Sequence, residues 1–402
     1  MKKRHMMIGL ISAAVIAAGC SQPVDSIPTV ILPESSEAQT TDTDTNMTGN
    51  VSDGNVSDGN AAGENTSDAG AASQTQKEPL DTSHMYRSEL TNEWIDESLK
   101  DQRPIAAMVD NELYALDHFG VNDADVVYEI MNSTENNRVT RLMCVVKDWQ
   151  NIQKLGSIRS VRTTNFMVAA EWNAIICHDG GPFYIQDYTS KAYVNNLSGG
   201  FARYSNGKAT EFTEYITYDA YTNSEKGKTY PGLGARIQSA KYSTTYNDYY
   251  PGQHFTFSDE EFKLSDSYTT SEATKISLPF PHNGSKLFYN SDTQTYDYYE
   301  YNKYHIDAAT GEVTTFKNVI LQSCSFVQLD PNGYLTYNVV GSGTDGYYIT
   351  NGEAIPITWS KDSETALTIF KNKATGEPIT LNTGKTYIAL VPSDSWSQLT
   401  LK

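Results

Sequence analysis

The residue types best suited to chemistry lie in the run GSIRSVR at residues 156–162. Two arginines of this run, Arg159 and Arg162, stand close before a predicted helix over residues 163–172. A helix N-terminus presents free N–H groups and a partial positive charge, and two guanidinium groups beside it suit a carboxylate or a phosphate. The sequence therefore predicts an anion-binding crevice at Arg159 and Arg162.

A second polar run, HDGG, follows a predicted strand at residues 174–177. In layered α/β sheets, ligands gather at the carboxyl ends of strands, and a glycine pair lets the backbone approach a ligand closely. We therefore expect His178, Gly180 and Gly181 to line the same crevice. Glu129, at the end of another predicted strand, is expected as their neighbour.

Two other interpretations of these residues stay open at this point. In an acidic chain the arginines could pair with the protein's own Glu129 or Glu171, and His178 could be purely structural. Alternatively, His178 could act as a general base, assisted by Asp179 or Glu129, in a hydrolase or transferase. The chain contains none of the common nucleophile, metalloprotease or phosphate-loop motifs, and no cofactor is predicted.

His305 and Asp307 would share one face of a strand, and such a pair could ligate a metal. The turn signal at Thr310 and Gly311 instead favours a hairpin edge, so no metal site is predicted.

The elements that must position these residues follow a layered pattern in the first half of the chain. Between residues 101 and 180, short apolar runs of strand length alternate with the predicted helix, which indicates an α/β layer. The runs lie at residues 105–109, 126–130, 141–146 and 174–177.

The pattern changes near residue 250. Turn signals recur between β-rich runs such as residues 334–340 and 387–391, which is typical of an all-β unit built from hairpins. We therefore predict an α+β chain in which an α/β layered domain, residues 86–248, precedes a β-rich domain, residues 249–402. The turn signals lie at residues 330–333, 341–343, 350–352, 374–376 and 382–384.

The N-terminus has the pattern of an export signal. A basic head, an apolar core and the sequence AAGC at residues 17–20 resemble the signal peptide and lipobox of bacterial lipoproteins. The resemblance implies that residues 1–19 are removed, that Cys20 is acylated, and that lipid holds the protein on the outer face of the cytoplasmic membrane. Residues 20–85 contain no aromatic side chain and are rich in small polar residues, which predicts a disordered linker.

Composition narrows the classes of partner. The formal net charge is −19, so a basic surface for nucleic acid is not expected. No segment after residue 19 approaches the roughly 20 apolar residues of a membrane-spanning helix. The later cysteines lie in apolar runs, which indicates small buried side chains, although one pair could form a disulfide. They are Cys144, Cys177 and Cys324.

An ordered series of short motifs resembles the YerB-like lipoprotein family, catalogued as domain of unknown function 3048. RPIAAMVDN at residues 103–111 and ADVVYE at residues 124–129 are similar to its N-terminal part, as are the two polar runs above. YHID at residues 304–307 and NTGKT at residues 382–386 are similar to its C-terminal part. The resemblance covers residues 90–395, implies a lipoprotein of two domains, and supplies no established activity.

Three candidate functions follow. The favoured one is a lipid-anchored extracytoplasmic protein that binds an anionic cell-envelope ligand, such as a peptide carboxylate or a phosphorylated polymer, near Arg159, Arg162 and His178. The second is a structural or partner-binding lipoprotein without a small-molecule site. The third is an envelope hydrolase or transferase that uses His178. The membrane, bound through lipid on Cys20, is the one definite partner that the sequence predicts.

Overall fold

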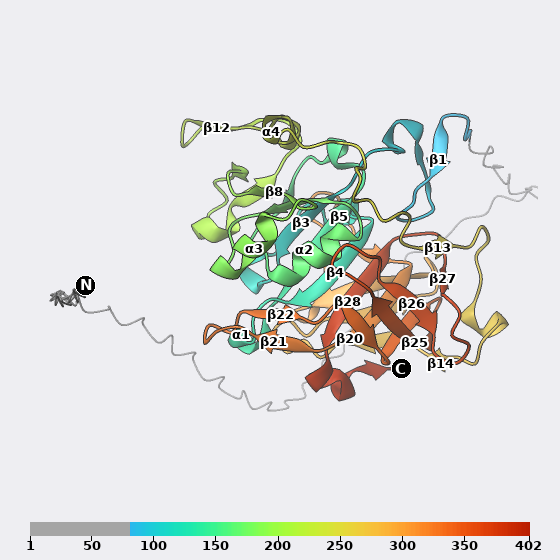
Figure 1. Cartoon of the computed structure of the whole chain (residues 1–402). Helices are drawn as coiled ribbons and strands as arrows, with labels where there is room; N and C mark the ends of the chain where they lie inside the picture. Colours follow the sequence, from blue (N-terminus) through green and yellow to red (C-terminus); the bar gives the residue numbers. More distant parts are fainter. Residues whose placement is uncertain (1–80) are drawn as a thin grey trace, which may run out of the picture. The chain divides into compact units, whose positions relative to one another are not determined.

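The computed structural model describes residues 81–402; the signal peptide, Cys20 and most of the predicted linker lie outside the described residues. One mixed sheet of twelve strands, the main sheet, runs through the described part (Figure 1). From edge to edge its path is β14 (Ser271–Glu272), β25 (Glu353–Lys361), β24 (Gly346–Thr350), β20 (Asn318–Cys324), β28 (Thr386–Pro392), β4 (Val126–Met131), β5 (Thr140–Val146), β3 (Ile105–Asp110), β7 (Ile175–His178) and β8 (Asn195–Ser198). β23 (Gly341–Gly343) and β26 (Ile369–Asn372) also pair with β25.

The centre of the main sheet joins the two halves of the chain. β28 lies between β20 and β4 and is parallel to both, so that Tyr387 stands opposite Val319 on one side and Val127 on the other. β4, β5 and β3 are antiparallel neighbours, and β7 and β8 continue parallel to β3. Strands from residues 86–248 and from residues 249–402 thus share one sheet. The division of the chain into two separate domains, residues 86–248 and 249–402, stays a prediction.

Each face of the main sheet is covered by its own apolar core, because successive strand side chains point to opposite faces. On one face, Met108 of β3 and Met143 of β5 pack in a core that includes Phe166. On the other face, Val109 packs in a core that includes Tyr296 of a second sheet. This second sheet comprises β18 (Lys303–Tyr304), β17 (Thr295–Glu300), β16 (Lys286–Asn290), β15 (Lys275–Ser277), β29 (Thr400–Leu401) and β19 (Thr315–Phe316).

Helices are few and short, so the described part is strand-rich and fits the predicted α+β class. The α-helices are α1 (Glu135–Arg138), α2 (Thr163–Ala170), α3 (Gln186–Thr189) and α4 (Leu233–Ala240). The other strands form small sheets: β1 (Met85–Arg87) with β2 (Trp94–Asp96); β6 (Leu155–Gly156), β10 (Glu214–Ile216) and β9 (Ala202–Arg203); β11 (Tyr221–Asn223) with β12 (Lys228–Tyr230); β13 (Thr256–Phe257) with β27 (Thr380–Leu381); and β21 (Phe326–Gln328) with β22 (Leu335–Tyr337).

Most of the predicted elements are present. The strands predicted at residues 105–109, 126–130, 141–146 and 387–391 are β3, β4, β5 and β28, and α2 confirms the predicted helix start. The turn predicted at residues 341–343 is wrong, because this segment is β23 and pairs with β25. The C-terminal half is also more than a set of hairpins, since β20 and β28 pair in parallel.

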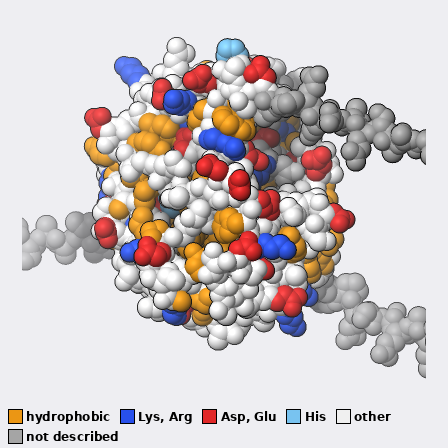
Figure 2. Space-filling model, turned by 90° about the vertical axis from the view of Figure 1, so that its right-hand side faces the viewer, with side chains coloured by type: hydrophobic (Ala, Val, Ile, Leu, Met, Phe, Trp, Pro, Cys, Tyr) orange, Lys and Arg blue, Asp and Glu red, His pale blue; other side chains and the backbone are white. Residues whose placement is uncertain are grey.

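The cysteine prediction is confirmed, because Cys144, Cys177 and Cys324 are free and buried. Within residues 81–402, no helix has both the length and the apolar character that a membrane crossing requires. On the face shown in Figure 2, acidic and basic side chains are interspersed.

Candidate anion-binding site

Main-chain pairing brings the two predicted polar runs together at the end of β3. Arg159 N donates to Met108 O at 2.9 Å, and Arg159 O accepts from Asp179 N at 2.9 Å. Val161 N donates to Gly180 O at 3.1 Å. The segment before α2 therefore lies between the carboxyl ends of the parallel strands β3 and β7, which is where a layered α/β sheet tends to bind ligands.

Three arginines, here called the arginine cluster, lie close enough at this place for their charges to act on one another. They are Arg141 at the start of β5, Arg159, and Arg162 directly before α2. Arg159 Nε lies 2.8 Å from Asp110 Oδ2, whereas Arg141 Nη1 lies 3.7 Å from Asp110 Oδ1. Asp110 is fully buried, and Arg141 and Arg162 are only 6% and 7% exposed. One buried carboxylate is thus shared by two of the arginines, Arg141 and Arg159.

Arg162 is held by neutral groups alone. Its Nε donates to Asn132 O at 3.1 Å, and its Nη1 donates to Ser160 Oγ at 3.0 Å and to Val161 O at 2.9 Å. Its guanidinium carbon lies 4.4 Å from the centre of the Tyr334 ring. Within residues 81–402 it forms no ion pair, and Asp330 is the carboxylate whose charge acts on it from a longer distance.

Arg141 is still less satisfied. Its Nε and Nη1 atoms are buried and donate no hydrogen bond within residues 81–402, since Asp110 lies 3.7 Å from Nη1 and is also used by Arg159. A buried polar group without a partner costs about 1–3 kcal/mol. An additional anion beside Arg141 would accept these free donors.

The electrostatics point in the same direction. Burial and the neighbouring Arg141 lower the pKa of Arg162 to about 9. Burial also lowers the pKa of Arg141, although Asp110 opposes the shift. The pKa of the half-buried Glu112 is raised by burial and by Asp110, while Arg141 and Arg159 oppose the shift. Burial thus disfavours the charged forms of Arg141 and Arg162, and an added anion would favour them.

A surface hollow of about 580 Å³ adjoins the arginine cluster. Glu112, Lys208 and Phe212 are among the residues that line it. The guanidinium carbon of Arg159 lies 5.5 Å from the centre of the Phe212 ring, and the Arg159 side chain is 27% exposed. Arg159 thus connects the buried arginines with a space open to solvent.

His178 and Asp179 do not converge on a common reactive point. His178 is buried, its Nδ1 lies 2.8 Å from Gly180 O, and its ring meets the edge of Phe166. The side chain of Asp179 instead pairs with Arg203 at 2.9 Å. Within residues 81–402, no hydrogen bond or ion pair joins His178 to Arg159 or Arg162. The structure therefore does not assemble the acid–base pair of the hydrolase interpretation.

The two glycines lie at the crevice for different reasons. Gly180 has a φ of +70°, a conformation that L side chains rarely adopt, and a Cβ there would meet open space. A Cβ on Gly181 would lie 2.7 Å from Ile185 Cδ1 and 3.1 Å from Val161 O. Gly181 therefore permits the close approach that the segment before α2 requires.

The expectation that Glu129 neighbours the arginines is wrong. Glu129 points to the same face of β4 as Val127, whereas Arg141 points to the opposite face with Met143. Its carboxylate accepts hydrogen bonds from Ser285, at 2.7 Å, and from other polar groups of the second face.

Glu171 is not a partner of the cluster either. It pairs with Lys361 at 3.0 Å and with His254. Arg159 pairs with Asp110. Internal ion pairing, the alternative to ligand binding, is therefore correct for this arginine, but its partner is Asp110 and not Glu129 or Glu171.

Sequence reasoning missed Arg141 and Asp110 as site residues. Both were visible as charged residues at the ends of apolar strands, Arg141 before residues 142–146 and Asp110 after residues 105–109. What the sequence did not contain is the antiparallel register of β3 and β5, which places these two residues opposite each other.

Two family domains match the chain: residues 90–231 match the N-terminal domain, and residues 276–388 the C-terminal domain, of DUF3048, a protein family of unknown function. The chain is 21% identical over 322 residues to YerB of Bacillus subtilis (strain 168), which is named as a candidate lipoprotein; the match covers 78% of this chain and 88% of that protein. The crystal structure of YerB from Bacillus subtilis matches with a TM-score of 0.64 at 16% identity, over 79% of this chain and 99% of that one, and so has the same fold. This chain belongs to the YerB-like DUF3048 family.

Proposed function

We propose that this protein is a lipid-anchored lipoprotein of the cell envelope that binds an anionic ligand at the arginine cluster. One observation carries the ligand: Arg141 and Arg162 are more than nine-tenths buried, and neither donates a hydrogen bond to a carboxylate. Arg162 forms no ion pair within residues 81–402, and Arg141 has only the 3.7 Å contact with Asp110. Burying positive charge with so little compensation is costly, and an anion that arrives from outside would supply the missing partner.

The chemistry of the cluster favours an oxyanion. Guanidinium groups present planar pairs of N–H donors that match the two oxygens of a carboxylate or a phosphate. A peptide carboxylate and a phosphorylated polymer are both anions of this class. Arg159 would meet such a ligand first, because it is the most exposed of the three arginines.

Titration calorimetry on the full chain, in detergent, tests the ligand site with inorganic phosphate and with N-acetyl-alanyl-alanine as probes. Arg162→Ala should weaken binding of the accepted probe roughly ten- to a hundredfold, because a charge-assisted hydrogen bond contributes about 1.5–3 kcal/mol. Arg87→Ala is the matched control, since Arg87 lies on β1, far along the chain from the cluster and outside it.

Melting curves without ligand separate binding from folding. Arg162→Ala strands no carboxylate, but it removes three hydrogen bonds to neutral acceptors, so its melting temperature should fall by only a few degrees. If Arg162→Ala unfolds at markedly lower temperature, or if neither probe binds the wild type better than this variant, the proposed site is wrong.

The anchor rests on the AAGC sequence at residues 17–20 and on the relationship to a protein named as a candidate lipoprotein. Acyl chains on Cys20 would hold the chain at the outer face of the cytoplasmic membrane. Cys20→Ser should release the protein from membranes or leave its signal uncleaved. A Cys20→Ser variant that is still processed and membrane-bound would disprove the anchor.

A further inference from the structure

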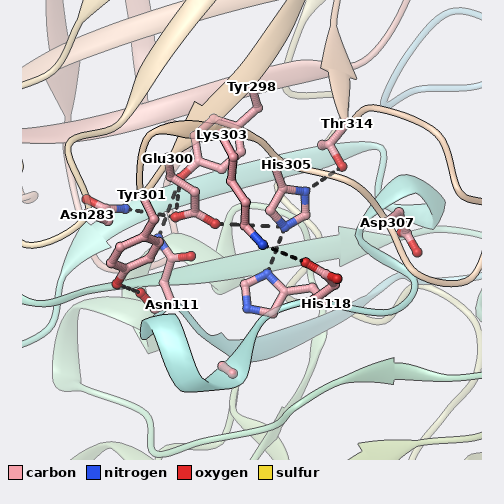
Figure 3. A network of polar contacts seen from close by, with 12 residues as sticks. Asn111, His118, Asn283, Tyr298, Glu300, Tyr301, Lys303, His305, Asp307 and Thr314 are labelled. Carbon is pink, nitrogen blue, oxygen red and sulfur yellow. Dashed lines mark hydrogen bonds and ion pairs between the residues drawn. The ribbon is translucent and has the colours of Figure 1, made fainter. Parts of the chain in front are cut away.

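Three side chains of types that commonly bind metals meet inside the protein, and none of them belongs to the arginine cluster. His118 precedes the bridge to β6, Glu300 ends β17, and His305 follows β18. All three are at most 2% exposed. One nitrogen or oxygen atom from each lies within 4.8 Å of the corresponding atoms of the other two. Figure 3 shows the two imidazoles and the Glu300 carboxylate directed toward one another.

The hydrogen bonds fix the tautomer of His305. The Thr314 hydroxyl donates its single proton to Asn122 Oδ1 at 2.7 Å, so its oxygen accepts the proton of His305 Nδ1 at 2.9 Å. His305 Nε2 then carries a lone pair, which accepts a hydrogen bond from His118 Nδ1. It lies 2.8 Å from His118 Nδ1 and 3.9 Å from Glu300 Oε1. A neighbour that orients a histidine in this way is typical of metal-binding imidazoles.

The surroundings contain acceptors that lack donors. Glu300 Oε2 accepts from Asn283 Nδ2 at 3.1 Å and from the Tyr298 hydroxyl at 3.3 Å, but Glu300 Oε1 is buried without a partner. Asn111 Oδ1 and Asn283 Oδ1, in the same network, are also buried without one.

A second carboxylate adds negative charge at this place. Glu129 accepts from the same two donors as Glu300, Asn283 Nδ2 at 2.8 Å and the Tyr298 hydroxyl at 3.0 Å. Two buried carboxylates that share their hydrogen-bond donors repel each other, and within residues 81–402 neither forms an ion pair with Lys or Arg. A divalent cation would balance both.

We propose that His118, Glu300 and His305 bind a divalent transition-metal ion of the zinc type. Tetrahedral zinc with ligand distances of about 2.1 Å separates its ligand atoms by roughly 3.4 Å. The observed separations of 2.8 Å and 3.9 Å lie on either side of this value, so small side-chain rotations suffice. Two imidazoles and a carboxylate favour zinc, nickel or cobalt over calcium or magnesium, which prefer oxygen ligands.

The ion would connect the two halves of the family architecture. His118 belongs to residues 90–231, and Glu300 and His305 belong to residues 276–388. Because the site forms only when both halves are folded together, metal binding would stabilise their association.

The experiment titrates Co²⁺ and Zn²⁺ into the full, untagged chain after EDTA treatment and dialysis. Wild-type protein should bind about one equivalent of Co²⁺ with a tetrahedral visible absorption spectrum, and Zn²⁺ should displace it. Excess Zn²⁺ should raise the melting temperature by about 5 °C or more. His84→Gln, at an exposed histidine outside the cluster, is the matched control and should behave like the wild type.

Two variants make the result decisive. His305→Gln should lose the cobalt spectrum. Thr314→Val keeps all three proposed ligands but removes the hydroxyl that orients His305 and donates to Asn122, and it should weaken Co²⁺ binding roughly ten- to a hundredfold. If His305→Gln does not fold, Thr314→Val and the wild-type titration still decide the question. A wild-type chain that binds no Co²⁺, or one whose Co²⁺ affinity is unchanged in Thr314→Val, would overturn the proposal.

Discussion

Glu171 shows what a satisfied buried charge looks like in this protein, in contrast to the arginine cluster. Its carboxylate receives Lys361 at 3.0 Å, His254, and both the N–H and the hydroxyl of Thr368. Burial alone would raise its pKa, but Lys361 and His254 outweigh burial and hold the pKa at about 2. Every acceptor atom of Glu171 is used, whereas Arg141 leaves buried donors free.

This carboxylate predicts an acid-dependent loss of stability. Because the pKa of Glu171 is lowered from 4.5 to about 2 by folding, its contribution is complete above pH 4.5 and is lost as the pH falls toward 2. The contribution is on the order of 3 kcal/mol. Urea unfolding should show Glu171→Gln to be much less stable than the wild type at pH 7, with the gap narrowing by pH 3. A gap that stays constant between pH 7 and pH 3 would show that the ion pair contributes nothing to this titration.

At the level of single residues, the sequence points to the charged residues at the strand ends but not to the side chains that contact them. Arg159 and Arg162 are predicted as site residues because they stand before a helix, and their segment does lie at the ends of β3 and β7. Glu129 was assigned to the wrong face, because a continuous apolar strand such as residues 126–130 does not reveal which face is which. His305 was weighed with Asp307, although the group that faces it, His118, is 187 residues away in the chain.

Among the elements, the turn between β21 and β22 carries Tyr334 over Arg162. Gly333 in this turn has a φ of +76°, and a Cβ there would lie 2.8 Å from Glu135 N as well as close to the Ser133 and Thr134 side chains. The glycine therefore lets the turn pack against the segment that also supplies Asn132 O to Arg162. Hydrogen bonds from Ser133 to Asn332 O and from Thr134 to Gln328 join the same two segments.

Gly333→Ala should consequently destabilise the protein by about 2–3 kcal/mol, since the left-handed conformation costs about 1–2 kcal/mol and the backbone contact must also shift. Gly376→Ala is the matched control, because Gly376 has a φ of +75° with no atom within 4 Å of the added Cβ, and it should cost only about 1 kcal/mol. Urea unfolding measures both. Equal losses in the two variants would show that the contact with Glu135 N is not limiting.

The element predictions succeeded where a local pattern was sufficient. β3, β4 and β5 follow from short apolar runs, and α2 from the residues that begin it, where Asn165 Oδ1 accepts from Arg162 N at 2.8 Å. β23 was missed because three residues of sequence GSG carry a turn signal, while their pairing with β25 is a tertiary contact.

For the whole molecule, the decisive fact is the position of β28 between β20 and β4. Its neighbours come from opposite halves of the chain, and nothing in the local sequence of residues 386–392 specifies them. The two family domains are matched separately, at residues 90–231 and 276–388, yet their strands share a sheet. The boundary between the two family domains is thus not a boundary of the main sheet, because backbone hydrogen bonds join strands from both domains.

The last prediction follows from this sheet. A fragment of residues 81–248 would lack β28, leaving the edge of β4 unpaired over residues 126–130, and it would lack the second sheet that covers one apolar face. We expect the fragment alone to show no cooperative urea transition in near-ultraviolet circular dichroism. Mixed with residues 249–402 it should recover a transition, because the β4–β28 ladder and both cores can then form. A fragment of residues 81–248 that unfolds cooperatively on its own would show that β4 does not need β28, and that the halves are independent domains that merely meet along one strand pair.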